Sequence, residues 1–373
     1  MRVRYVGPIF EPSGYGHAAR TNILALLQAG VDVSTDTLPT YLNESHNFGS
    51  GQREITQRLN QTGPWDAQII HYTPELWKRC YKDNVKVTVG MAVWETSDVH
   101  PLWTKVMNVP WIDEVWVPNK YNADVFQKTV IRPIYTVPHV VDTAAYDRCK
   151  LKLSINSVRP DSFMFYSIFQ WTHRKNPDGL LYAYFTEFKP DEKVALVLKT
   201  SGTNFTKEDQ SKITASISDT RLSLGKIDTP SLYLLMESLS DQQIVELHNR
   251  GDCYVSPHRG EGWGLPITEA MAACKPVITT GYGGPLEFCN GDNSYLVDHT
   301  LSPVHSMRWS PWYLGTQTWA EPSIMSIRKQ MRNVFEHQAE AVGKGIAGRQ
   351  TMEQYTPNKV GVRMRDRLAE LLR

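Results

Sequence analysis

The 373-residue sequence predicts an α/β protein of two domains, each with parallel strands joined by crossover helices. Three observations lead to this fold class. The chain is long enough for two domains of ordinary size, and short apolar runs alternate with helical patterns in both halves. The alternation is interrupted once, by a polar, proline-containing stretch near residues 138–160. We therefore expect one domain over 1–150, a second over 151–356, and a C-terminal helix over 357–373 that crosses back to pack on the first domain.

The first half of the chain begins with a strand, a turn rich in glycine and proline, and a helix. The strand is expected at residues 2–6, the turn is GPIFEPSGYG, and the helical pattern covers 17–28. This alternation favours parallel strands, because each return to the same edge of a sheet needs a crossover. Further strands are expected at 31–33, 69–72, 86–93, 114–117 and 135–137.

The second half of the chain repeats the alternation. It starts with the apolar run FMFYSIF, residues 163–169. The segment 319–323 is expected in a loop-rich region after the last strand. The remaining strands are expected at 194–198, 222–224, 253–256, 276–279 and 295–297.

Composition and charge exclude several classes of protein. Hydrophobic residues make up 41% and charged residues 21% of the chain, which is the balance of a globular protein. The formal net charge of +1 disfavours a dedicated nucleic-acid binder, although a nucleic-acid partner is not excluded. The five cysteines show no CxxC spacing, and no signal peptide is evident, so a reduced, cytoplasmic compartment is expected. The basic run RMRDRLAELLR allows a peripheral membrane contact, but a solvated helix face explains it as well.

The most informative stretch is VSPHRGEGWGLPITEAMAACKPVITTGYGG, residues 255–284. A strand ends near residue 256, a glycine-rich loop follows, and Pro266 suits the first turn of a helix. Backbone N–H groups and the positive end of the helix dipole then converge on one point, which favours binding of a diphosphate. Glu261 in the loop and Glu269 in the helix can face opposite ends of one ligand, one gripping a sugar ring and the other a ribose diol.

Residues 261–284 resemble the donor-binding signature of family 4 of the retaining glycosyltransferases, whose hallmark is E-x7-E within EGxGLPxxEAMA. The resemblance implies the GT-B fold, with two Rossmann-like domains facing each other across a cleft. It also implies that Glu261 contacts the transferred sugar and that Glu269 binds the nucleotide ribose. The loop between them is implied to approach the sugar and the diphosphate; its residues are Gly262, Trp263, Gly264 and Leu265.

Cationic side chains for the leaving diphosphate are expected in FQWTHRKNPDGLL. Family members commonly have an Arg and a Lys here, about five residues apart; this chain has Gln170 at the Arg position and keeps Lys175. We predict that Lys175 contacts phosphate. Arg174 is assigned to the donor site or, equally, to the solvated surface. Lys199, at the end of the next expected strand, is a further donor-site candidate.

The first domain offers three weaker candidates. Gly14 lies in SGYGHAAR, which resembles the glycine loop that closes on the donor diphosphate or lines the acceptor side. His71 and Glu95 fall at expected strand ends, where each could orient the acceptor hydroxyl as a catalytic group. A structural role is the alternative for both.

The resemblance and the residues together predict a hexosyltransferase that retains the anomeric configuration of its donor, a UDP-glucose-like or GDP-mannose-like nucleotide sugar. The chain contains no Asp-x-Asp, so we expect transfer without a metal or any other cofactor. The expected acceptor is a saccharide or glycoconjugate, in glycan synthesis. A sugar-nucleotide epimerase of GT-B fold and a glycosyltransferase acting on a modified nucleic-acid base are the alternatives.

Overall fold

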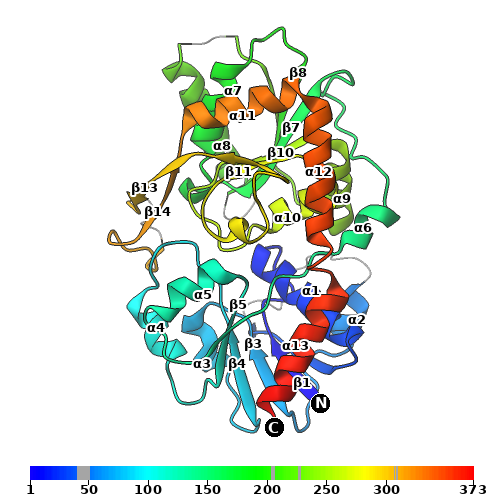
Figure 1. Ribbon diagram of the computed structural model, residues 1–373, viewed down its shortest axis with the longest axis vertical. Helices are drawn as coiled ribbons and strands as arrows, with labels where there is room; N and C mark the ends of the chain where they lie inside the picture. Colours follow the sequence, from blue (N-terminus) through cyan, green and yellow to red (C-terminus); the bar gives the residue numbers. More distant parts are fainter. Residues whose placement is uncertain (40–50, 203–205, 226–227, 306, 308–309) are drawn as a thin grey trace. The chain divides into compact units, whose positions relative to one another are not determined.

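The computed structural model describes residues 1–39, 51–202, 206–225, 228–305, 307 and 310–373. They form two compact units, shown in Figure 1: Met1–Asp142 with Glu353–Arg373 (unit 1), and Thr143–Met352 (unit 2). The boundaries predicted from the sequence, after residues 150 and 356, lie eight and four residues beyond the unit boundaries. All residues predicted for the functional site lie in the described ranges.

Unit 1 contains a six-stranded parallel sheet with the strand order β2-β1-β3-β4-β5-β6. This confirms the parallel α/β arrangement predicted for the first half of the chain. The strands are β1 (Arg2–Val6), β2 (Asp32–Asp36), β3 (Ala67–Ile70), β4 (Val87–Met91), β5 (Glu114–Val117) and β6 (Ile134–Thr136). The helices are α1 (Gly14–Gln28), α2 (Gln52–Thr56), α3 (Trp77–Cys80), α4 (Pro101–Met107), α5 (Lys120–Gln127) and α13 (Pro357–Leu371), with a 3-10 turn η3 (Pro74–Leu76).

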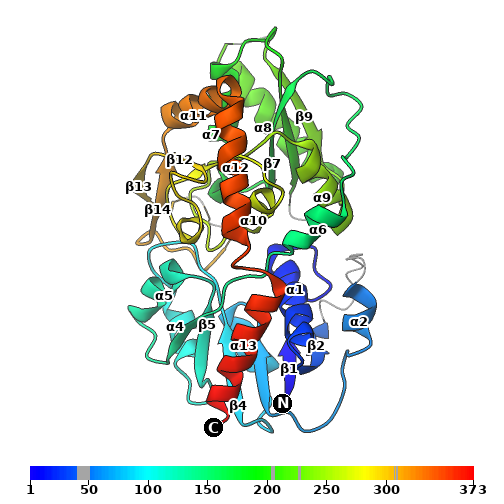
Figure 2. The same ribbon diagram turned by 45° about the vertical axis from the view of Figure 1, so that its right-hand side comes forward.

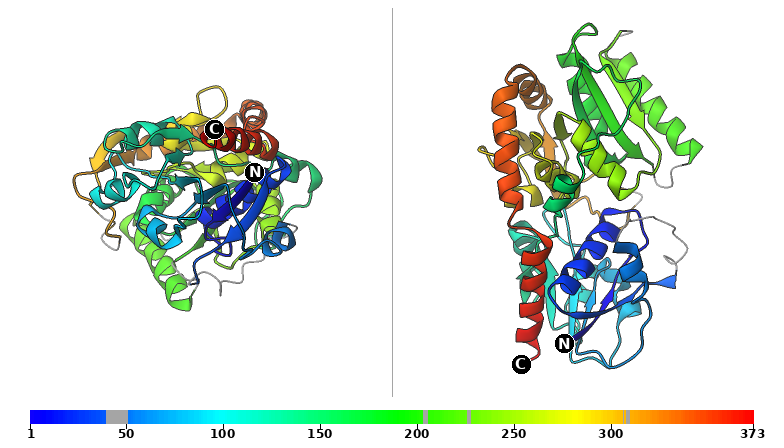
Figure 3. Two further views of the ribbon diagram at one scale, coloured as in Figure 1. Left: turned by 90° about the horizontal axis from the view of Figure 1, so that it is seen from below. Right: turned by 90° about the vertical axis from the view of Figure 1, so that its right-hand side faces the viewer.

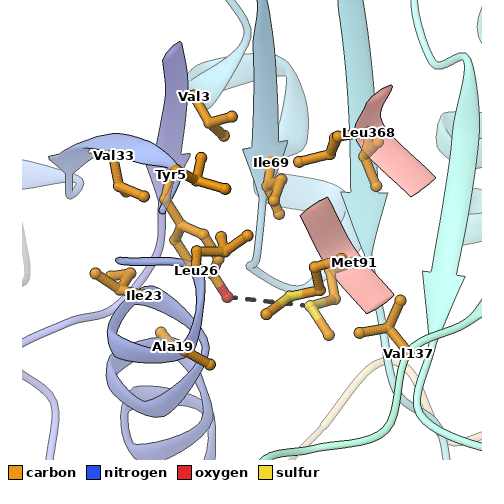
Figure 4. Close-up of a cluster of buried hydrophobic side chains, with 14 of the residues drawn as sticks. Val3, Tyr5, Ala19, Ile23, Leu26, Val33, Ile69, Met91, Val137 and Leu368 are labelled. Atoms are coloured by element: carbon orange, nitrogen blue, oxygen red, sulfur yellow. Dashed lines mark hydrogen bonds between the residues drawn. The ribbon is translucent and has the colours of Figure 1, made fainter. Parts of the chain in front are cut away.

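The core of unit 1 brings together the sheet and helices α1 and α13. Val3 and Tyr5 of β1, Ile23 and Leu26 of α1, and Leu368 of α13 are all buried in one cluster (Figure 4). The last helix of the chain therefore belongs to the first unit. Both views in Figure 3 show this red helix beside the dark-blue helix α1.

Helices α1 and α13 approach most closely at Gly361. A Cβ built on Gly361 would lie 2.1 Å from the carbonyl oxygen of Ala25, a backbone atom that cannot rotate away. We expect Gly361→Ala to destabilise the protein by about 1–3 kcal/mol, because the two helices must separate. The matched control is Gly343→Ala, in a helix of unit 2 where a Cβ meets nothing within 4 Å; it should stabilise by about 0.5–1 kcal/mol. Urea unfolding midpoints measure both, and equal midpoints would contradict this account of the α1–α13 contact.

Unit 2 contains a second six-stranded parallel sheet, with the order β12-β11-β10-β7-β8-β9, and an antiparallel pair β13-β14. Its strands are β7 (Phe163–Gln170), β8 (Val194–Ser201), β9 (Ser231–Leu235), β10 (Cys253–Ser256), β11 (Val277–Thr280), β12 (Tyr295–Val297), β13 (His299–Pro303) and β14 (Thr318–Pro322). Its helices are α6 (Thr143–Arg148), α7 (Pro177–Glu187), α8 (Lys207–Ser223), α9 (Asp241–Arg250), α10 (Leu265–Ala272), α11 (Ile324–Glu336) and α12 (Gln338–Met352), with 3-10 turns η4 (His173–Lys175) and η5 (Gly284–Glu287). Helices α7 and α11 pack against each other (Figure 2). Within the described parts of the chain, no helix combines the length and apolar character that crossing a membrane requires.

Two sequence predictions for this half are wrong. The apolar triplet 222–224 is not a strand: it ends helix α8, and Leu222 is 77% exposed. The strand at this edge of the sheet is β9, which lies further along the chain. The segment 319–323 is not a loop either, because most of it forms β14, paired with β13. Both errors concern short elements at an edge, where neighbouring segments rather than local pattern decide the structure.

Candidate functional site

The chain reverses its direction of travel across the unit 2 sheet at the pair β7 and β10. From β7 the sheet continues through β8 to β9, and from β10 it continues the opposite way through β11 to β12. Ligands of open α/β sheets bind at the carboxyl ends of the strands at such a reversal. The loop after β7 (171–176) carries the predicted Arg174 and Lys175, and the loop after β10 (257–264) carries Glu261.

Glu261 brings the two loops together through its carboxylate. Lys175 Nζ donates to Oε1, and Arg174 Nη1 lies 3.2 Å from Oε2. Arg174 also donates to the carbonyl oxygen of Gly260 at 2.8 Å. The side chain of Glu261 is only 9% exposed, so the structure places an ion triad in a largely desolvated setting. The sequence left Arg174 open between site and surface; the structure places it against Glu261.

The electrostatic balance of this triad keeps Glu261 ionised. Burial by itself would raise the pKa of Glu261, but the charges of Lys175 and Arg174 outweigh it and lower the pKa to about 2. The carboxylate therefore acts only as a hydrogen-bond acceptor at any physiological pH. A group of this kind can hold sugar hydroxyls and cannot serve as a general acid.

The two loops are fastened by residues that the sequence analysis missed. Arg259 N–H donates to the Arg174 carbonyl oxygen at 2.8 Å, and the Arg259 guanidinium makes a two-pronged pair with Glu321 at 2.6 and 2.8 Å. Asn176 caps helix α7 and donates from Nδ2 to the Pro257 carbonyl oxygen at 3.0 Å. Asn before Pro at a helix start was a readable capping signal, whereas nothing local marks the partner of Arg259.

Helix α10 starts directly at the predicted signature. Its N-cap is Gly264, whose φ of +97° lies in the left-handed region that suits glycine, and Pro266 occupies the first turn. The N-cap glycine makes no side-chain capping hydrogen bond of its own, an arrangement that leaves the positive end of the helix available to an anion. Gly262 is buried and Leu265 is half-buried.

The second glycine loop supports the backbone of Glu261. Gly284 N–H donates to the Glu261 carbonyl oxygen at 2.8 Å. Gly283 has a φ of +79°, and a Cβ there would lie 2.9 Å from the same oxygen. The GYGG sequence at the end of the stretch 255–284 thus lets a turn approach the backbone beneath the triad.

Trp263 does not lie on the surface of the signature loop. Its side chain is 2% exposed, and its ring packs 5.0 Å from that of Phe288. These contacts support a structural contribution of Trp263 to the loop. The predicted contact of Trp263 with the donor stays a prediction. Glu269, in contrast, is half-buried on α10, with Oε2 lying 3.5 Å from Nε2 of His248.

His258 is a further residue that sequence reasoning missed. Its ring is fully buried in the loop after β10, and neither ring nitrogen has a hydrogen-bond partner among the described residues. Burial lowers the pKa of His258 to about 3, so the ring is neutral despite its proximity to Glu261. A single His in a loop carries no sequence signal that would single it out.

Lys199 lies inside strand β8, opposite Ile168 of β7, rather than at its end as predicted. Burial lowers the pKa of Lys199 to about 8, and the charge of Glu237 opposes the shift. If Lys199 contacts the diphosphate, UDP affinity should fall by up to tenfold per pH unit above about pH 8, because binding must then take up a proton. Calorimetric titration at pH 7.5 to 9.5 measures this. Lys199→Arg should bind with a flat profile, and a Lys199→Met protein with the wild-type slope would exclude the contact.

In unit 1, His71 follows β3 directly, as predicted. Its Nδ1 lies 2.6 Å from Tyr5 Oη, and Asn22 Nδ2 donates to the same oxygen at 3.2 Å. Of the two acceptors near the phenol, Nδ1 at 2.6 Å is much closer than Met91 Sδ at 4.0 Å, so we assign the phenol proton to Nδ1 and the imidazole proton to Nε2. Burial and then the charge of His139 lower the pKa of His71 to about 3. A neutral ring with this tautomer is a hydrogen-bond donor, not a base.

The other two unit 1 candidates lie in different local settings. Gly14 is the first residue of helix α1, with Ser13 as N-cap, so the predicted loop position is wrong. The capping sequence Ser-Gly-Tyr-Gly starts the helix three residues before the predicted start at residue 17. Glu95 lies four residues after β4 and is half-buried. Burial and then the charge of Glu95 raise the pKa of Tyr15, so this phenol stays protonated.

Comparison with known proteins identifies the segment that contains the triad. Residues 154–304 match the family described as Glycosyl transferases group 1. A sucrose synthase of Melioribacter roseus is 31% identical over 101 residues. The matched segment covers 26% of this chain and 13% of that enzyme, so it is a small part of the relative.

Solved structures similar to this chain share its fold over the full length. HepE of Anabaena, in complex with UDP and glucose, gives a TM-score of 0.68 at 12% identity, covering 99% of this chain and 100% of that chain. Sucrose-phosphate synthase of Thermosynechococcus elongatus gives 0.70 at 12% identity, covering 100% and 99%. Together with the two parallel sheets, this confirms the predicted GT-B fold of two Rossmann-like domains. Residues 154–304 therefore match the glycosyl transferases group 1 family within a chain of GT-B fold, which supports the predicted enzyme class, a glycosyltransferase.

Proposed function

We propose that this chain transfers a hexose from a nucleoside diphosphate sugar to an acceptor hydroxyl with retention of the anomeric configuration. The observation that carries the proposal is the triad of Glu261, Lys175 and Arg174 next to the start of α10. One carboxylate and two cations leave the triad with a charge of +1. A cationic site at the N-terminus of a helix is suited to bind a diphosphate.

The residues of the triad fit distinct parts of the reaction. Glu261, ionised and acceptor-only, is suited to receive hydrogen bonds from the hydroxyls of the transferred sugar. Lys175 and Arg174 are suited to take up the negative charge that grows on the leaving phosphate. Fixed cations in this role make a metal unnecessary, so we infer metal-independent transfer.

Retention is what the family resemblance implies, and this scheme assigns no side chain as the nucleophile of a double displacement, so we propose attack on the front face of the sugar. We propose that the leaving phosphate itself assists deprotonation of the acceptor on the same face of the sugar. The neutral His71, with its proton on Nε2, fits a group that orients the acceptor and does not fit a base. Glu95 remains our proposal for a second acceptor contact.

UDP is the preferred donor nucleotide in this proposal. The structures of HepE that resemble this chain were obtained with UDP and with UDP-glucose, and TarM of Staphylococcus aureus, also similar, was obtained with UDP. The acceptor that we propose is a saccharide or glycoconjugate.

The test is a transfer assay with a panel of UDP- and GDP-sugars against saccharide acceptors, with and without EDTA. We expect transfer from a UDP-hexose, unchanged by EDTA, and a product whose anomeric NMR coupling matches that of the donor. A product of inverted configuration would reject retention, and strict dependence on manganese would reject the metal-free scheme. Conversion of the donor without any acceptor would identify an epimerase instead.

A further inference from the structure

Three polar side chains, Tyr166, His248 and Glu269, lie in a row that ends at Glu269 of helix α10. Tyr166 of β7 and His248 of α9 are both fully buried, and Tyr166 Oη lies 2.8 Å from His248 Nδ1. On the other side of the same ring, His248 Nε2 lies 3.5 Å from Glu269 Oε2. The Glu269 side chain is 18% exposed, so it is the member of this row that is accessible to a ligand.

Hydrogen-bond chemistry decides which of the three side chains donate and which accept. A carboxylate only accepts, so the imidazole nitrogen next to Glu269 must carry the proton to make a favourable contact. His248 is then a donor at Nε2 and an acceptor at Nδ1. The matching donor at Nδ1 is the Tyr166 phenol, which keeps its proton because burial raises its pKa well above the usual value.

The ring of His248 is also held in place by packing. Tyr166 and Tyr146 meet it edge-on, with centroids at 5.5 and 6.0 Å. Gly251 is what allows Tyr166 to lie so near the end of α9, because a Cβ at Gly251 would lie 2.2 Å from the Tyr166 ring. The ring cannot turn freely, so the Nε2 proton has a fixed direction.

We propose that Tyr166 and His248 are positioning residues, which orient the Glu269 carboxylate to receive the ribose hydroxyls of the donor nucleotide. This inference rests on the proposed function and on the ribose role that the family resemblance implies for Glu269. Each carboxylate oxygen has two lone pairs, so the 3.5 Å contact from His248 leaves capacity for both hydroxyls of the diol. The role is to fix the rotation of the carboxylate. An isolated Glu on a helix surface has no neighbour that does this.

The experiment is a comparison of UDP with 2′,3′-dideoxy-UDP by calorimetry, in the wild type and in four variants of the full chain. His248→Leu removes the donor, and we expect UDP affinity to fall about tenfold while the affinity for the dideoxy ligand changes less than twofold. Tyr166→Phe should show a smaller loss of the same kind. His248→Gln places an amide donor near the position of Nε2 and should restore most of the UDP affinity, whereas His248→Asn should not.

Two controls separate positioning from folding and from the proposed function. His337, exposed at the C-cap of α11, gives the matched control His337→Leu, which should leave both affinities unchanged. Glu269→Ala should lose affinity for UDP and not for the dideoxy ligand; if it loses neither, the ribose role of Glu269 fails, and the inference with it. If Glu269→Ala shows the ribose-specific loss while His248→Leu and Tyr166→Phe weaken both ligands equally, only the positioning role is overturned. A wild type that binds neither UDP nor GDP would overturn the proposed function itself.

Discussion

Replacing Glu261 with Gln should lower kcat/KM for transfer by about 10²–10³-fold while UDP binds at least as tightly as to the wild type. In the structure the Glu261 carboxylate neutralises one of the two charges supplied by Lys175 and Arg174. Gln has the same size but no charge, so the site gains one net positive charge. A free nucleoside diphosphate, which has no sugar to lose contact with, then meets a more cationic site.

This opposite response of binding and transfer is what distinguishes a sugar-binding carboxylate from a structural one. Calorimetry with UDP and initial rates with the UDP-sugar measure the two quantities on one preparation. Glu340→Gln, at an exposed position on α12, is the matched control and should change neither. If Glu261→Gln weakened UDP binding and transfer in equal proportion, the carboxylate would be holding the loop together and not the sugar.

The sequence predicted the parts of this site that depend on local pattern. The E-x7-E spacing, Pro266 in the first turn and the glycines before it are all properties of one short segment, and α10 begins where they indicate. The parallel strands were predictable for the same reason, because a buried strand such as β8 begins with a continuous apolar run, VALVL.

The sequence did not predict contacts between segments distant along the chain. Arg259 and Glu321 are 62 residues apart, and Arg174 and Glu261 are 87 apart. No periodicity records such a pair; it exists only once the sheet has brought two loops to one edge. The same holds for the tautomer of His71, which depends on Tyr5, 66 residues earlier, and on Asn22.

The error at residues 222–224 shows the limit of apolar runs as a strand signal. Leu222 and Leu224 flank a serine at the end of an otherwise polar helix, and a run of three residues satisfies either element. The strand that closes the sheet, β9, is only half-buried along its length because it lies at an edge. The register of β9 is set by its pairing with β8, and the local sequence pattern of β9 does not contain this information.

Lys175→Met should reduce kcat by about 10²–10³-fold, because the variant loses the cation proposed to stabilise the leaving phosphate. Lys175→Arg keeps the charge and should retain more of the activity, with some loss because the guanidinium cannot reproduce the compact ammonium contact. The change also has a second consequence, which a loss of activity alone does not reveal. Lys175 and Arg174 together overcome the burial that would otherwise raise the pKa of Glu261.

Without Lys175, the burial of Glu261 is opposed mainly by Arg174, so the pKa of Glu261 should rise from about 2. A carboxyl whose folded-state pKa is depressed contributes stability above its unfolded value, and this contribution is lost as pH falls through the folded pKa. For the wild type the loss falls between the ordinary value of 4.5 and about 2. In Lys175→Met the contribution is smaller, so acid unfolding followed by circular dichroism should begin at higher pH than in the wild type.

A double variant separates the two roles of Lys175. In Lys175→Met with Glu261→Gln there is no buried carboxylate left to protonate, so the acid unfolding curve should no longer depend on the residue at 175. Transfer should stay low, because the phosphate contact is still absent. If Lys175→Met shifts the acid curve equally with Glu or Gln at 261, the pairing of the two side chains is not what stabilises this loop, and the cation acts on another group.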